Sequence, residues 1–246
     1  NIFNLNLNLQ RILKDGHSGV DVRNKLAQAY LQQNCFTDAL RQYEHMLEYF
    51  VTRQRENPAY REKICIIHLN IADLYRKMNT FKGEYKNGQI LQNFVYRYNR
   101  EAQLLLKERT VLPVLKGPVN AMTTKALFEK MEEIIFEHYS QAITFFPPDQ
   151  HLLKKAEVLL HVGRHQSQKG QAVEAMKYLR ETLIILSKER STESIFESRL
   201  EAISIFKKSI GSLGKHPKVE EFREFISHME NRCNAEKEEW DDTQRR

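Results

Sequence analysis

The sequence predicts an all-α fold built from antiparallel helix pairs, and three observations support this prediction. Glycine and proline are scarce, with 9 and 6 copies among 246 residues, which is few for an all-β or loop-rich fold. Apolar residues recur three and four positions apart, the spacing that places side chains on one face of an α-helix. Polar breaks separate these periodic segments, so consecutive helices are expected to pack against each other.

Residues 24–47 show this pattern for one helix pair. The apolar faces of the two predicted helices consist of Leu26, Ala27 and Tyr30, and then of Ala39, Tyr43, Met46 and Leu47. Between them, Asn34 suits a left-handed turn and Thr37 is placed to cap the second helix. The small residues let the two backbones approach closely, and the aromatic side chains fill the space beside them. Two short helices cannot bury both faces alone, so further pairs are expected to stack on this one.

This pattern resembles the tetratricopeptide repeat (TPR). The signature positions of that repeat are filled here by Leu26, Ala27, Tyr30, Ala39, Tyr43 and Met46. The resemblance covers residues 22–50 and 149–189 best, with 64–81 as a half-match. It implies a right-handed α-solenoid of about three to five stacked helix pairs. It also implies a binding module, in which the first helix of each pair lines a concave groove that holds a peptide or helix of a partner.

Other stretches repeat parts of the pattern. The half-match places Ile71, Ala72 and Tyr75 at the positions of Leu26, Ala27 and Tyr30. In the other well-matched stretch, Val162 and Gly163 precede a turn and Ala175 and Leu179 follow it. The end of a further repeat is indicated by Tyr139, Ala142 and the helix-stopping Pro147. Residues 199–233 again read as a helix, a glycine-containing break and a helix, and 213–219 resemble the linker of kinesin-light-chain-type repeats.

The spacing between repeats is irregular. Ala27 and Ala72 are 45 residues apart, and Ala72 and Gly163 are 91 apart, whereas the repeat has a period of 34 residues. Either the helices are longer than usual or a segment is inserted, and an irregular insert is expected at 82–120. All 246 residues are interpreted as one TPR-like domain. Because the chain opens on Asn1 without a methionine, it is also interpreted as a fragment of a longer protein.

The charge distribution indicates where a partner would bind. The net charge is +6, and residues 51–118 alone hold 13 Lys or Arg against 6 Asp or Glu. Such a basic region favours an acidic or amphipathic peptide or helix of a partner protein. The candidate partner-binding residues are Arg76, Lys77, Lys82, Lys86, Arg97 and Arg100. The alternative ligand is RNA, because Phe94, Tyr96 and Tyr98 interleave with cations in region 76–100 and such aromatics can stack bases.

Several functions are disfavoured by the residues themselves. No glycine-rich phosphate loop or nucleophile elbow occurs, so we expect a non-catalytic segment without a cofactor. His161 and His165 are four positions apart but have no third ligand at a recognisable distance, so no metal site is predicted. Three widely spaced cysteines favour a reducing compartment, which is the cytoplasm or alternatively the nucleus. No apolar run approaches the length of a membrane-spanning helix, so membrane insertion is not expected.

Overall fold

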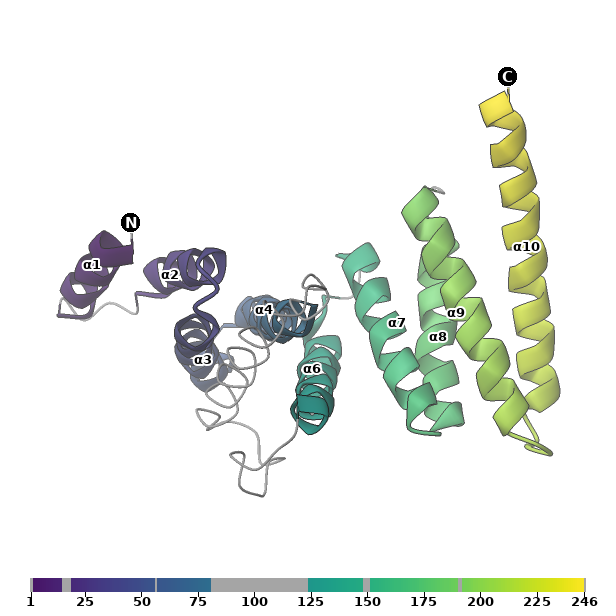
Figure 1. Ribbon diagram of the computed structural model, residues 1–246, viewed down its shortest axis with the longest axis horizontal. Helices are drawn as coiled ribbons and strands as arrows, with labels where there is room; N and C mark the ends of the chain where they lie inside the picture. The colour runs from purple at the N-terminus through teal and green to yellow at the C-terminus, as the bar shows by residue number, and fades with distance from the viewer. Residues whose placement is uncertain are drawn as a thin grey trace, which may run out of the picture. The chain divides into compact units, whose positions relative to one another are not determined.

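The computed structural model describes residues 2–14, 19–55, 57–80, 124–147, 151–189 and 192–245. Across these ranges all regular secondary structure is helical, which confirms the all-α prediction (Figure 1). The helices are α1 (Ile2–Lys14), α2 (Val20–Gln32), α3 (Phe36–Arg53), α4 (Tyr60–Thr80), α6 (Thr124–Phe145), α7 (Leu152–Gln168), α8 (Ala172–Leu186), α9 (Glu193–Ser212) and α10 (Val219–Arg245). They form two compact units, Asn1–Phe145 and Phe146–Arg246.

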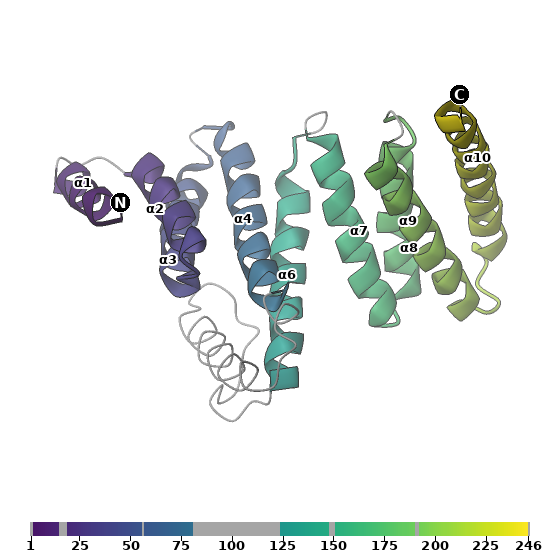
Figure 2. The ribbon, with the colours of Figure 1, turned by 45° about the horizontal axis from the view of Figure 1, so that its top comes forward.

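In the first unit, α2 and α3 form the helix pair that the sequence predicts at 24–47 (Figure 2). The turn between them depends on Asn34, whose φ of 57° is the left-handed conformation expected for it. The backbone N–H of Cys35 then donates to the carbonyl of Tyr30 at 2.9 Å. Because α3 already begins at Phe36, its cap position is Cys35, and the prediction that Thr37 caps this helix is wrong.

The α2–α3 pair packs as its small residues predict. Leu26, Ala27 and Ala39 are fully buried, and Tyr43 is 2% exposed. The pair is also linked by a hydrogen bond from Arg23 Nη1 on α2 to Gln42 Oε1 on α3, at 3.0 Å. The next helix, α4, packs on α3 and begins the neighbouring pair.

The second pair of this unit joins two segments that are far apart in the sequence. α4 packs against α6, although residues 81–123 separate them and lie outside the described residues, as does the predicted insert at 82–120. Near the start of α4, Arg61 Nη2 donates to the carbonyl of Thr144 near the end of α6, at 3.1 Å. Since the beginning of one helix meets the end of the other, the two helices are antiparallel. The half-match at 64–81 and the repeat end near Pro147 thus belong to one helix pair.

The second unit contains two more neighbouring helix pairs, α7–α8 and α9–α10. Gly170 makes the turn after α7 with a φ of +76°, and Gly214 makes the turn after α9 with a φ of +57°. The core of the unit is built around Leu179, Phe206 and Phe222, which lie on three of its helices. The two phenylalanine rings meet edge to face with centroids 5.9 Å apart.

A buried arginine ties three helices of the second unit together. The side chain of Arg199 on α9 is 4% exposed and pairs with Glu236 on α10. Its guanidinium also donates to the backbone carbonyl of Leu186, the last residue of α8, and to that of Glu189 in the turn that follows. The Leu186 carbonyl also accepts from the backbone N–H of Glu189 at 3.3 Å, so Arg199 adds donors to the turn that ends α8. Arg232 contacts the same region, donating to Glu236 at 3.0 Å.

Candidate interaction surface

Two stripes of side chains lie on the first helices of the pairs in the first unit. On α4 the stripe consists of Ile66, Asn70, Asp73 and Lys77, and on α2 it consists of Asp21, Lys25, Gln28 and Gln32. Each stripe follows the spacing of three and four residues that defines one helical face. All of these side chains are exposed or half-buried. We call the two stripes together the first-helix surface.

The two stripes meet where α4 ends. Lys77 Nζ on α4 donates to the carbonyl of Leu31 on α2 at 2.9 Å. This carbonyl belongs to the last turn of α2, where the helix dipole favours a cation. Lys77 therefore joins the two first helices as well as contributing charge to the surface.

A polar cluster joins α4 to α6. It consists of Asp73 and Arg76, which precede Lys77 on α4, and Tyr139 of α6. The Tyr139 hydroxyl donates to Asp73 Oδ1 at 3.0 Å and accepts from Arg76 Nη1 at 2.9 Å. Burial, and then the charge of Asp73, raises the pKa of Tyr139. The same two causes raise the pKa of Tyr43 on α3. Asp73 on α4 therefore interacts with tyrosines of both α3 and α6, and Arg76 contributes to the packing between α4 and α6.

The six cations predicted to bind a partner divide into two groups. Arg76 and Lys77 lie on α4, where both make the contacts described above. The other four are Lys82, Lys86, Arg97 and Arg100, and they lie outside the described residues. So do Phe94, Tyr96 and Tyr98, on which the RNA alternative depends.

The residues predicted to pack the repeats lie in the helix interfaces. Buried among them are Leu26, Ala27, Ala39, Tyr43, Ile71, Ala72, Tyr75, Gly163, Ala175 and Leu179. Tyr30 is half-buried and its hydroxyl accepts a hydrogen bond from Asn6 Nδ2 on α1 at 3.2 Å. Gly163 allows a close approach of α7 to α8, because a Cβ at this position would lie 2.8 Å from Leu179 Cγ.

In the second unit, the first helices α7 and α9 also contact each other. Arg164 on α7 pairs with Glu201 on α9, and the hydroxyls of Ser167 and Ser209 are 3.1 Å apart. His161 and His165 are half-buried on α7. Within the described ranges, no cluster of three or more His, Cys, Asp or Glu side chains is arranged to hold a metal ion. Over the same ranges, no helix is long and apolar enough to cross a membrane.

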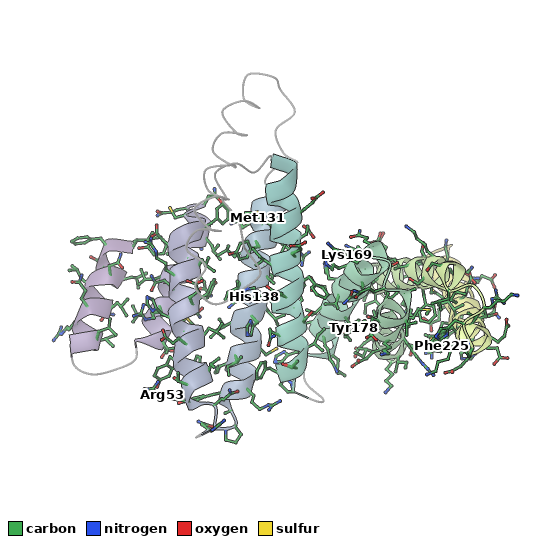
Figure 3. The ribbon with its side chains drawn as sticks, turned by 90° about the horizontal axis from the view of Figure 1, so that it is seen from below. Arg53, Met131, His138, Lys169, Tyr178 and Phe225 are labelled. Atoms are coloured by element: carbon green, nitrogen blue, oxygen red, sulfur yellow. The ribbon has the colours of Figure 1, made fainter. Side chains whose placement is uncertain are left out.

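Sequence reasoning did not single out the buried histidines of the first unit. His68 on α4 and His138 on α6 are 7% and 6% exposed, and their Nδ1 atoms are 2.9 Å apart. Figure 3 shows His138 on α6 beside α4. In the sequence, His68 is marked only by its place within the apolar run 64–72. Nothing in that run indicates a contact with His138, 70 positions later.

Comparison with known proteins adds no relative from which a function could be transferred: no protein-family model matches the chain, and no curated protein matches it significantly.

Proposed function

We propose that the chain is a non-catalytic protein-interaction module whose helix pairs stack as a TPR-like right-handed α-solenoid. The observation that carries the proposal is the recurrence of buried small residues in successive helix pairs. These residues are Ala27, Ala39, Ala72, Ala142, Gly163 and Ala175. Stacking is supported by the contacts between first helices, from Lys77 to the Leu31 carbonyl in one unit and from Arg164 to Glu201 in the other.

The first-helix surface has the chemistry to hold a peptide. The amide side chains of Gln28 and Asn70 each donate and accept hydrogen bonds, so they can pair with a peptide backbone. Ile66 is 36% exposed and offers an apolar contact. Lys25 is exposed on the neighbouring stripe and would attract an acidic residue of the ligand. This combination favours an acidic or amphipathic peptide or helix as the partner.

The same proposal includes a location in the cytoplasm or the nucleus. Its support is that Cys35, Cys65 and Cys233 are all free thiols. Free thiols persist in reducing compartments, whereas oxidising compartments favour disulfides.

A peptide selection tests the binding surface. Peptides would be selected from a random phage library on the full chain, and their affinities measured by fluorescence anisotropy with the parent and a Gln28→Ala/Asn70→Ala variant. Loss of two hydrogen-bonding groups should weaken binding about tenfold. Glu48→Ala, on the exposed face of the second helix α3, is the matched control and should leave affinity unchanged. Selected peptides that bind the double variant as tightly as the parent would contradict the proposed surface.

The RNA alternative gives a different result in a parallel measurement. A single-stranded RNA would compete with the selected peptides, and its affinity would fall steeply as salt is added, because phosphate contacts release counterions. A peptide anchored by Ile66 and amide hydrogen bonds should show a much shallower salt dependence. Competition by RNA with a steep salt slope would favour a nucleic-acid ligand over a protein partner.

A further inference from the structure

The contact between His68 and His138 constrains where protons can sit. A hydrogen bond between two Nδ1 atoms 2.9 Å apart needs one ring with a protonated Nδ1 and one with a bare Nδ1. A first additional proton can go to the unprotonated Nε2 of the donor ring, which keeps the hydrogen bond but places a charge in the interface. A second proton must go to the bare Nδ1 of the acceptor ring. It would set two N–H groups against each other and bring two like charges together.

The apolar surroundings of the pair make even the first protonation unfavourable. Ile64 and Ile71 lie on α4, one turn before and after His68, and both are buried, as are Ile134 and Ala142 on α6. The ring of Phe145 stacks on His68 with an interplanar angle of 13° and a centroid distance of 6.3 Å. Burial lowers the pKa of His68 to about 4 from its ordinary value of 6.5. A charged imidazolium is therefore less stable in this interface than in water.

Several ionisable groups of α4 and α6 near the pair have other partners or stay neutral. Arg61 lies 5.5 Å from the Phe145 ring centroid and donates to the Thr144 carbonyl. Beyond His68, Asp73 and Arg76 interact with Tyr139, the neighbour of His138. The thiol of Cys65 is neutral between pH 5 and pH 7, since its pKa is raised by burial and by the charge of Glu62 to about 12 from an ordinary value of 9.0. Glu137, which precedes His138 on α6, is half-buried.

Helix α3, which packs on α4, brings Tyr43 and His45. The pKa of Tyr43 is raised by burial and by Asp73, so its hydroxyl stays neutral. The pKa of His45 is lowered by burial and by Arg23 of α2, and raised by Glu48. The pKa of His68 is lowered by burial, and none of these charged groups offsets that effect of burial.

From this geometry we propose that the His68–His138 pair is an acid-sensitive latch: protonation loosens the packing of α4 on α6, while the second unit stays folded. The selectivity follows from burial, since these two are the buried histidines of the described residues. In the second unit, His161 and His165 are half-buried and His228 is exposed. Acid therefore introduces a buried imidazolium in the first unit only.

The direction of the pH effect follows from linkage. A histidine whose folded-state pKa is lowered contributes stability that is fully present above pH 6.5 and is lost as the pH falls toward 4. From pH 7 to pH 5, His68 alone should reduce the equilibrium constant for closing α4 on α6 about 20-fold. Because α4 also carries one of the two stripes of the first-helix surface, opening would release a bound partner. That consequence rests on the proposed function, whereas the latch itself does not.

Hydrogen exchange measured by mass spectrometry on the full chain tests the latch without any ligand. Protection factors, corrected for the intrinsic pH dependence of exchange, would be compared at pH 7 and pH 5. Peptides from 60–80 and 124–145 should lose about 20-fold in protection, and peptides from α8 and α9 should change less than about twofold. Equal protection of α4 and α6 at the two pH values would overturn the proposal.

A variant separates the pair from other titrating groups. His68→Gln/His138→Gln keeps donors and acceptors in the interface but cannot be protonated, so its protection should lose most of its dependence on pH in this range. His45→Gln, also in the first unit, is the matched control and should retain most of the parent's pH dependence. If the double variant lost protection at the same pH as the parent, the latch would be excluded. If that variant did not fold, the imidazole titration of the parent by NMR would decide, since the latch requires His68 to titrate well below 6.5.

Discussion

Gly163 on α7 faces Leu179 on α8 so closely that an added Cβ would lie 2.8 Å from Leu179 Cγ and 2.9 Å from Leu179 Cδ2. Gly163→Ala should therefore force the helices apart and lower the free energy of unfolding by about 1–3 kcal/mol. Urea denaturation followed by circular dichroism measures this change. The control is Gly211→Ala on the exposed face of α9, where a Cβ meets open space. Alanine should stabilise that helix by about 0.5–1 kcal/mol, so equal effects at the two sites would contradict the close packing of α7 on α8.

Enlarging Ala39 tests the α2–α3 pair in the same way. Ala39 is fully buried in that pair, so Ala39→Leu should destabilise the first unit by about 1–3 kcal/mol through overpacking. Thermal unfolding of the full chain gives the effect. Ala235→Leu on the exposed side of α10 makes the same change in volume without a partner helix to displace. If both variants unfolded like the parent, Ala39 would not lie at a helix crossing.

Replacing Arg199 by Met should destabilise the second unit strongly. The substitution removes the guanidinium donors to the Leu186 carbonyl and one of the two arginine partners of the half-buried Glu236, at a cost of about 2–4 kcal/mol. Arg223→Met is the matched control, because its ion pair with Glu220 is exposed and should contribute less than about 1 kcal/mol. Adding Glu236→Leu to Arg199→Met should recover part of the loss. A double variant that is less stable than the single one would contradict the inference that Glu236 is destabilising once Arg199 no longer pairs with it.

The cysteines should differ in reactivity. Burial and the charge of Glu62 raise the pKa of the Cys65 thiol to about 12, so at pH 8 only about one thiol in ten thousand is ionised. Ellman's reagent should modify the half-buried Cys35 in the native protein and reach Cys65 only after unfolding. Because the folded-state pKa is raised, stability should also fall as the pH rises above 9.0, where unfolded thiols lose their protons first. Rapid native labelling of Cys65 would contradict its burial.

The segment between α4 and α6 should be replaceable. Since the start of α4 meets the end of α6, the residues that flank the segment, Thr80 and Thr124, lie at the same end of the pair. A flexible Gly/Ser linker of about six residues in place of 82–120 should therefore preserve the pair, and its shorter loop costs less closure entropy. Circular dichroism and hydrogen exchange of α4 and α6 measure the outcome. If exchange protection of both helices disappeared, the pair would depend on contacts from the replaced segment.

Local patterns in the sequence were sufficient to predict the helix faces. The apolar spacing of Leu26, Ala27 and Tyr30, and the left-handed turn at Asn34, depend only on residues within a few positions of one another. The cap of α3 was predicted wrongly within the same segment, because the turn ends at Cys35 and the helix begins at once. Helix boundaries depend on small backbone differences that periodicity does not encode.

The sequence by itself determined the all-helical class, the buried faces of the helices and the small residues that let pairs approach closely, since helical periodicity and side-chain size are local properties. Only the tertiary structure decided that α4 pairs with α6 across residues 81–123. It also joined Arg76 to Tyr139 and His68 to His138, and brought Arg199 to the end of α8. Polar contacts of this kind need two side chains within about 3 Å of each other. That proximity depends on how separate helices pack against each other. The spacing of residues along the sequence does not predict this packing.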